Sequence, residues 1–231
     1  MTQSTHLQMP DGMLPVYIAE PSAPAKAAIV VIQEIFGVNA GIRRRCDMFA
    51  EKGYLAIAPD LFWRIEEGIE LDPDIKPELD RAMSLLEGFD VDKGIDDIKV
   101  AVAEARHRLG REGKVGAVGY CAGGRFAFLT AARSDVDAAV SYYGFGIENH
   151  LGEKDGIRAP LLLHYGKKDQ FIPGDAVAKI REGLSSLPHV EIHEYDGAGH
   201  GFATEFGERR VESPAKVADE RTAAFFTSHL L

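Results

Sequence analysis

One stretch of the sequence constrains the fold more than any other. An apolar run at residues 114–118 leads directly into G-Y-C-A-G-G at residues 119–124, and helix-forming residues follow through 125–132. Small residues let a strand and the next helix approach closely, so this stretch predicts a sharp strand-to-helix turn with Cys121 at its apex. A chain with such a unit belongs to the folds in which helices pack against a sheet.

Other apolar runs of strand length recur along the chain. They begin at Ala27, Tyr54, Asp137, Ala159 and Val190. Most are continuous rather than alternating, which is typical of strands buried on both faces of a parallel sheet. Helical periodicity lies between them, most clearly over residues 90–109, and Asp11-Gly12 separates two alternating stretches as in a hairpin. We therefore predict an α/β fold with a mostly parallel, doubly wound sheet and an antiparallel N-terminal hairpin at its edge.

The length and composition predict a single domain over residues 1–231. The chain is 45% hydrophobic and shows no internal repeat or long Gly/Ser linker. Residues 60–90 break the alternation of strands and helices with acidic residues and prolines. We expect this excursion to be a lid over a ligand crevice, and a surface decoration is the alternative. Ser213-Pro214 is predicted to open the last helix.

The charge balance excludes several classes of partner. Lys and Arg total 26 against 36 Asp and Glu, a net charge of −10, which disfavours nucleic acid and anionic membranes. No apolar run approaches the roughly 20 residues that span a bilayer, and the first residues do not resemble a leader segment. The two cysteines are far apart and form no metal-binding motif, so we expect a cytoplasmic protein without metal or organic cofactor. Monomer and homodimer both stay open.

The turn at Cys121 is the first candidate for chemistry. It has the G-x-S-x-G pattern of a nucleophile elbow with cysteine in the serine position. The helix N-terminus favours the thiolate, and the N–H of Ala122 points at the site as an oxyanion-hole donor should. Two alternatives are that Cys121 is a small buried core residue, or that the glycines cradle a dinucleotide.

An aspartate and a histidine follow two later predicted strands, and their order along the chain is informative. Asp169 lies 48 residues after Cys121, and His200 lies 31 residues after Asp169. The order nucleophile, acid, base is that of α/β-hydrolases, and sites in such sheets form at the carboxyl ends of strands. The alternatives are an aspartate that starts a turn and a histidine in a glycine-rich loop. We predict a Cys121-His200-Asp169 triad.

At this point the chain resembles a known family, the dienelactone hydrolases (carboxymethylenebutenolidases), over nearly its whole length. The motifs that carry the resemblance are V-V-I-Q-E-I-F-G at 30–37, Y-L-A-I-A-P-D-L at 54–61, G-Y-C-A-G-G at 119–124, Y-Y-G at 142–144, G-K-K-D at 166–169 and G-A-G-H-G-F at 197–202. The resemblance implies the same triad. It also implies that Glu34 contacts the resting nucleophile and that the N–H of Ile35 is the second oxyanion donor.

Three aromatic residues that follow strands are candidates for an apolar substrate pocket, with plain core packing as the alternative. They are Phe36, Tyr142 and Phe202.

The sequence departs from the family where a substrate carboxylate is held. Thr204 stands where the resemblance leads us to expect an arginine, four residues after His200. Arg81 lies near the place of a second expected arginine, and Arg209 and Arg210 follow later. We therefore expect a weak preference for carboxylated substrates.

These observations predict a hydrolase that cleaves an activated lactone or ester through a thioester on Cys121. The alternatives are a carboxylesterase or thioesterase of broad range and a non-catalytic binding protein with a reactive thiol.

Overall fold

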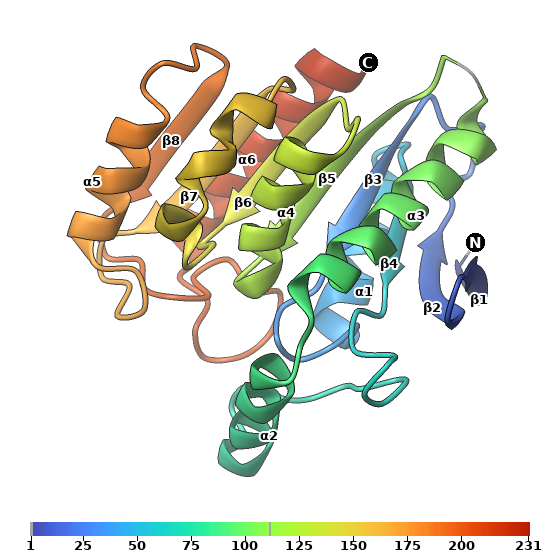
Figure 1. Cartoon of the computed structure of the whole chain (residues 1–231), viewed down its shortest axis with the longest axis horizontal. Coiled ribbons are helices and arrows are strands. Elements are labelled where there is room, and N and C mark those ends of the chain that lie inside the picture. The colour runs from blue at the N-terminus through green and yellow to red at the C-terminus, as the bar shows by residue number, and fades with distance from the viewer. Residues whose placement is uncertain (1, 111) are drawn as a thin grey trace. The chain divides into compact units, whose positions relative to one another are not determined.

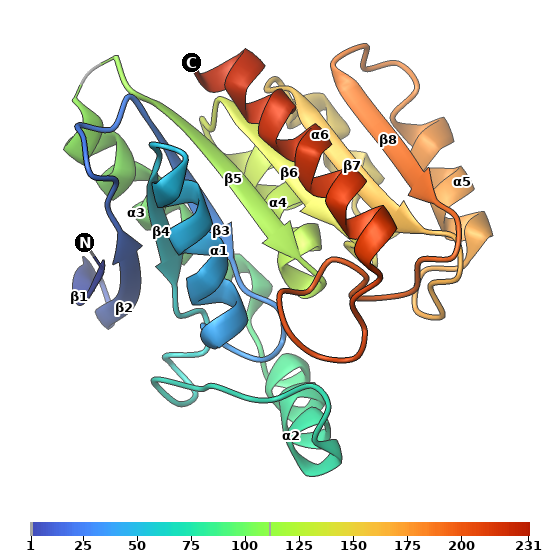
Figure 2. The ribbon, with the colours of Figure 1, turned by 180° about the vertical axis from the view of Figure 1, so that it is seen from behind.

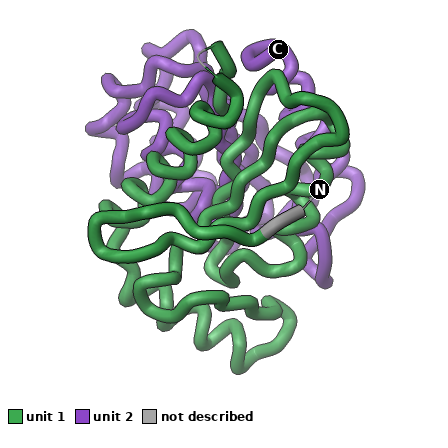
Figure 3. Tube along the Cα trace, turned by 90° about the vertical axis from the view of Figure 1, so that its right-hand side faces the viewer, with its two compact units in different colours: residues 1–116 green, residues 117–231 purple. Residues whose placement is uncertain are grey.

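The computed structural model describes residues 2–110 and 112–231. They group into two compact parts, residues 1–116 and 117–231, which Figure 3 colours green and purple. The single domain over 1–231 stays a prediction.

The first part is a four-stranded sheet with helices on both faces. Its strands follow the order β1-β2-β4-β3 and are β1 (Thr2–Met9), β2 (Gly12–Ala19), β3 (Ala27–Ile32) and β4 (Leu55–Pro59). The pairs β1-β2 and β2-β4 are antiparallel and β3-β4 is parallel, so the predicted N-terminal hairpin is confirmed. The helices α1 (Ala40–Glu51) and α3 (Val91–Leu109) cover opposite faces of this sheet (Figures 1 and 2).

The second part begins within β5 (Lys114–Tyr120). Its other strands are β6 (Ala138–Tyr142), β7 (Leu161–Gly166) and β8 (Val190–Tyr195), and the pairs β6-β7 and β7-β8 are parallel. The helices α4 (Ala122–Arg133) and α5 (Gly174–Gly183) cover one face, and α6 (Glu212–Leu230) covers the other (Figures 1 and 2). Two short 3₁₀ helices, η1 (Ile147–Asn149) and η2 (Leu151–Gly156), follow β6.

Burial explains why the strands read as continuous apolar runs. Every residue of β3, β4, β6 and β7 is buried, as expected for strands covered on both faces. The mostly parallel sheet with helices on both faces agrees with the sequence prediction.

The start of the last helix differs from the prediction. Helix α6 begins at Glu212, after Val211, and Ser213 makes no capping hydrogen bond. Pro214 still falls within the first turn, where an N–H has no acceptor in the helix and its loss costs little.

The excursion at residues 60–90 has two sections. Hydrogen bonds fix its first half. The Asp60 carboxylate accepts from the N–H of Phe62 and of Gly68, and the indole N–H of Trp63 donates to the Asp97 carboxylate. Its second half carries α2 (Lys76–Glu87), which lies apart from α1 and α3 (Figures 1 and 2). Whether this segment is a lid stays a prediction.

Candidate active site

The turn between β5 and α4 holds Cys121 in a strained backbone. Its φ is 57° and its ψ −119°, a region that L-residues rarely adopt. A Cβ at Gly119 would lie 1.8 Å from the Gly123 carbonyl oxygen, so only glycine permits the close approach. The N–H of Cys121 donates to the Tyr142 carbonyl oxygen at 3.1 Å, which ties the turn to the end of β6.

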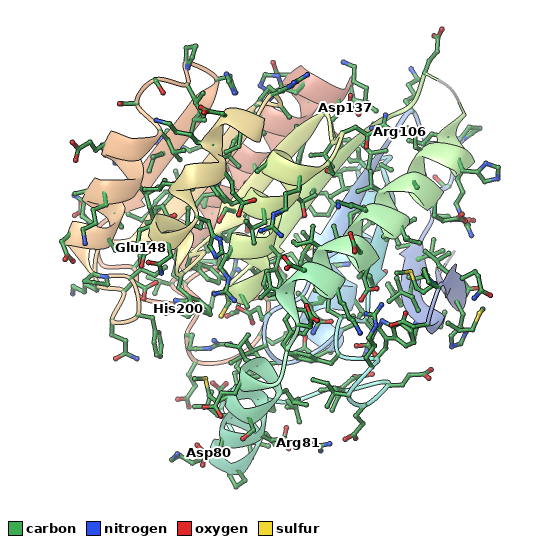
Figure 4. All side chains as sticks on the ribbon, viewed as in Figure 1. Asp80, Arg81, Arg106, Asp137, Glu148 and His200 are labelled. Atoms are coloured by element: carbon green, nitrogen blue, oxygen red, sulfur yellow. The ribbon has the colours of Figure 1, made fainter. Side chains whose placement is uncertain are left out.

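His200 joins the other two residues of the predicted triad. Its Nδ1 lies 2.8 Å from Oδ2 of Asp169, and its Nε2 lies 3.1 Å from Sγ of Cys121. Asp169 follows β7 and His200 follows β8, so both lie beyond the carboxyl ends of strands, and Figure 4 labels His200 there. These contacts bring together three side chains that are distant in sequence.

The carboxylate of Asp169 is fixed by the loop that carries it. Its Oδ1 accepts from the N–H of Phe171 at 2.8 Å and of Ile172 at 3.2 Å, while Oδ2 faces His200. Its side chain is fully buried. The same carboxylate therefore shapes the turn and contacts the imidazole, and its catalytic role stays a prediction.

The environment of His200 favours its protonated form. Burial opposes a charged imidazole, but the Cys121 sulfur and the Asp169 carboxylate offset it and raise the pKa of His200 from 6.5 to about 10. An imidazolium beside a sulfur that carries negative charge is the ion pair that activates cysteine nucleophiles.

Aromatic rings surround the imidazole of His200. The centroids of the Phe171, Tyr143 and Phe145 rings lie 5.0, 5.1 and 6.4 Å from it. Phe202, a predicted pocket residue, is fully buried and packs on Tyr143 at 5.6 Å. The sequence did not predict Tyr143, Phe145 or Phe171 as site residues, although each lies within three residues of a predicted one, Tyr142 or Asp169.

Tyr142 makes its hydrogen bonds in the core. Its hydroxyl donates to Asp219 at 2.9 Å and lies 2.6 Å from the Thr222 hydroxyl, and its ring lies 4.5 Å from that of His164. These contacts fit the packing alternative better than a place in the substrate pocket.

His164 belongs to the same buried network. Its Nδ1 lies 2.8 Å from the Tyr195 hydroxyl and its Nε2 lies 3.0 Å from Thr222. Burial, then the charges of His193 and Arg221, lower the pKa of His164 well below 6.5. A neutral, fully paired imidazole of this kind supports the core of the second part.

The loop after His200 carries the residues that the sequence associates with a substrate carboxylate. Thr204 is buried, and its carbonyl oxygen accepts from Arg210 at 3.0 Å. Arg210 also pairs with Glu212 at 2.8 Å. The guanidinium of Arg209 lies over the backbone of Gly201, where an added Cβ would meet its Nη1 at 3.0 Å.

The remaining predicted site residues lie in the first part. Glu34, Ile35 and Phe36 follow β3 after one intervening residue, Gln33, and all three are buried. Arg81 is exposed on α2, where it pairs with Glu66 and projects into solvent (Figure 4). All four residues belong to the first part of the chain, residues 1–116, and their roles in the site stay predictions.

Neither a metal-binding cluster nor a membrane-spanning helix is found among the described residues. No cluster of three or more His, Cys, Asp or Glu side chains there is arranged to hold a metal ion. In the same residues, no helix has the length and hydrophobicity needed to span a membrane.

Comparison with known proteins identifies the family. The model of the dienelactone hydrolase family matches residues 14–230. The chain belongs to this family. It is 43% identical over 231 residues to an Azospirillum brasilense protein assigned as a carboxymethylenebutenolidase, covering 95% of each chain. It is 40% identical over 228 residues to the carboxymethylenebutenolidase of Pseudomonas putida, covering 97% of this chain and 96% of that one.

A solved structure agrees with this membership. The crystal structure of a Klebsiella pneumoniae protein assigned to the dienelactone hydrolases superimposes with a TM-score of 0.85 at 29% identity and covers 98% of each chain. This dienelactone hydrolase family chain therefore has the α/β-hydrolase fold and is a hydrolase, as the sequence predicts.

Proposed function

We propose that this chain hydrolyses an activated lactone or ester through a thioester on Cys121. The observation that carries the proposal is the bridge formed by His200, which contacts both the Asp169 carboxylate and the Cys121 sulfur. The names of the relatives, carboxymethylenebutenolidases, support a lactone as the substrate class.

In the first half of the reaction, the Cys121 thiolate attacks the carbonyl carbon and the carbonyl electrons move to oxygen. The tetrahedral intermediate collapses when the C–O bond breaks and the leaving oxygen takes the proton from Nε2 of His200. For a lactone this opens the ring and leaves the product tethered as a thioester. Asp169 holds Nδ1–H throughout, so Nε2 is the nitrogen that exchanges the proton.

In the second half, neutral His200 accepts a proton from water at Nε2, and the hydroxide attacks the thioester carbonyl. The C–S bond then breaks, the acid product leaves, and the thiolate-imidazolium pair is restored.

The N–H of Ala122 is the proposed oxyanion donor in this part. Ala122 is the first residue of α4, so its N–H has no acceptor within the helix. The helix N-terminus also carries partial positive charge, which favours an oxyanion there. By resemblance we propose that the N–H of Ile35 is the second donor, that Glu34 contacts the resting nucleophile, and that Phe36 lines the substrate pocket.

A thiolate nucleophile limits the range of substrates. Thiolate is a better leaving group than a simple alkoxide, so the tetrahedral intermediate proceeds only when the alcohol oxygen leaves easily. Activated lactones, enol esters and aryl esters meet this condition, and amides do not. We also propose a cytoplasmic location, because both cysteines are free thiols.

Intact-mass spectrometry of the protein mixed with an aryl ester or lactone tests the proposal. An adduct of the acyl mass that appears within a turnover, maps to Cys121 and decays with product release is the expected result. Turnover that persists in Cys121→Ala would refute the proposal. A stable adduct without turnover would indicate a binding protein with a reactive thiol.

A further inference from the structure

Arg125 is an arginine without an ionic partner close to the nucleophile. It lies on α4, one turn after Cys121, and its N–H donates to the Cys121 carbonyl oxygen at 3.4 Å. Among the described residues, no carboxylate oxygen lies within 4 Å of its guanidinium, and its buried Nε has no hydrogen-bond partner. Its pKa is lowered by burial, which the charges of Cys121 and Glu148 partly offset.

Aromatic side chains hold this guanidinium beside the site. Its central carbon lies 5.0 Å from the centre of the Phe145 ring and 5.2 Å from that of Phe126. The Phe145 ring in turn lies 6.4 Å from the imidazole of His200. Stacking on aromatic faces orients a guanidinium while leaving its N–H groups available to another partner. Arg125 therefore presents positive charge to the region that contains the nucleophile and its histidine.

Stability alone does not explain an arginine in this place. Partial burial of a guanidinium costs free energy that a carboxylate partner normally offsets. Three other arginines of the second part have such partners, as in the pairs Arg133–Glu153, Arg181–Glu194 and Arg210–Glu212. Arg125 has only the longer-range fields of Cys121 and Glu148, so an incoming anion is the partner that its donors lack.

We propose that Arg125 determines specificity by binding a carboxylate of the substrate while Cys121 attacks the ester or lactone carbonyl. The guanidinium fork suits a carboxylate and forms two parallel hydrogen bonds with it. This inference rests on the proposed function. Thr204 led to the expectation of a weak preference for carboxylated substrates. Arg125 instead supplies a cation from α4, so the proposal predicts a strong preference.

A pair of thiol reagents tests the proposal without any ester. Iodoacetate and iodoacetamide differ mainly in one negative charge, and both alkylate a thiolate by displacing iodide. We expect the ratio of their rate constants at Cys121, iodoacetate over iodoacetamide, to fall at least about tenfold in Arg125→Gln. Arg125→Lys should retain much of the ratio.

Matched variants separate a local contact from the general field. Arg181→Gln removes the same charge from an exposed arginine paired with Glu194, and it should leave the ratio unchanged. The proposal is overturned if the rate ratio falls equally in Arg181→Gln, or if it falls in Arg209→Gln but not in Arg125→Gln. It is also overturned if Arg125→Gln slows both reagents equally. Equal slowing would show that Arg125 acts on the sulfur. If Arg125→Gln folds poorly by thermal unfolding, Arg125→Met preserves the packing on Phe145 and answers the same question.

Hydrolysis of a carboxylated aryl ester and its neutral analogue completes the test. The kcat/KM ratio, carboxylated over neutral, should fall in parallel with the alkylation ratio. If acyl adducts form on Cys121 but neither ratio depends on Arg125, this inference fails while the proposed function stands. If no acyl adduct forms, the proposed function fails, and the alkylation ratio still reports on Arg125.

Discussion

Asp169→Asn tests whether the carboxylate of Asp169 controls the tautomer of His200. Asparagine has the shape of aspartate, and its oxygen can still accept from the N–H groups of Phe171 and Ile172 at the Oδ1 position. Its NH2 group then faces Nδ1 of His200, where the carboxylate oxygen lies at 2.8 Å. Two donors cannot face each other, so the imidazole must place its proton on Nε2, toward Cys121. That nitrogen then no longer accepts a proton from thiol or water.

The expected loss follows from the role of that nitrogen. In serine hydrolases with the same arrangement, the wrong tautomer reduces kcat by about 10⁴-fold. A thiol ionises more easily than a serine hydroxyl, so we expect a fall of about 10³-fold here, roughly 4 kcal/mol at 1.36 kcal/mol per tenfold. His200→Ala should cost more, because it removes the base itself.

Steady-state hydrolysis of an aryl ester measures the effect, and ring-nitrogen NMR shifts of His200 report the tautomer. Asp196→Asn is the matched control, because Asp196 is an exposed aspartate paired with Lys167, and it should retain activity. The reasoning is refuted if Asp169→Asn loses less than about tenfold in kcat, or if it loses activity while Nδ1 of His200 still carries the proton.

Three further predictions follow from the same geometry. Iodoacetamide should modify Cys121 long before Cys46, whose thiol pKa is raised by full burial; peptide mapping checks the order, and equal labelling would contradict it. Gly119→Ala should cost at least about 3 kcal/mol of unfolding free energy in urea, because its Cβ would lie 1.8 Å from a backbone oxygen, whereas Gly174→Ala has open space and should cost little. The His200 imidazole should titrate by NMR near pH 10 and at a lower pH in Cys121→Ser, which lacks the negative sulfur. Folding raises this pKa, so protonated His200 stabilises the folded state fully below pH 6.5, and this stabilisation is lost as the pH rises through about 10. Loss of the stabilisation on acidification would contradict the assignment.

The three side chains of the proposed triad could be located from the sequence because local structure fixes their positions. The small residues around Cys121 permit only a tight strand-to-helix turn, and continuous apolar runs identify the strands that precede Asp169 and His200. The carboxyl ends of parallel strands lie at one edge of a sheet. Residues that follow such strands, as Cys121, Asp169 and His200 do, are therefore expected to lie close together. The same reasoning does not locate helix ends: the predicted first helical residue, Pro214, lies two residues after Glu212, where α6 begins.

The aromatic residues around the His200 imidazole were harder to predict because they lie where the backbone leaves regular structure. Tyr143 has a φ of 38°, so its ring departs from the alternation of β6 and lies against His200, whereas Tyr142 is directed into the core. Phe171 owes its place to the turn that Asp169 caps, and Phe145 to the loop before η1.

The position of Arg125 explains why the net charge of the chain does not determine the charge of the ligand that we propose. A net charge of −10 disfavours anions at long range, but that field is screened within about 10 Å at ordinary salt. At contact distance, a half-buried guanidinium held by Phe145 and Phe126 outweighs it. If this holds, raising the salt concentration should change the iodoacetate rate much less than Arg125→Gln does. A salt effect as large as the effect of the substitution would mean that the general field, and not Arg125, sets the preference.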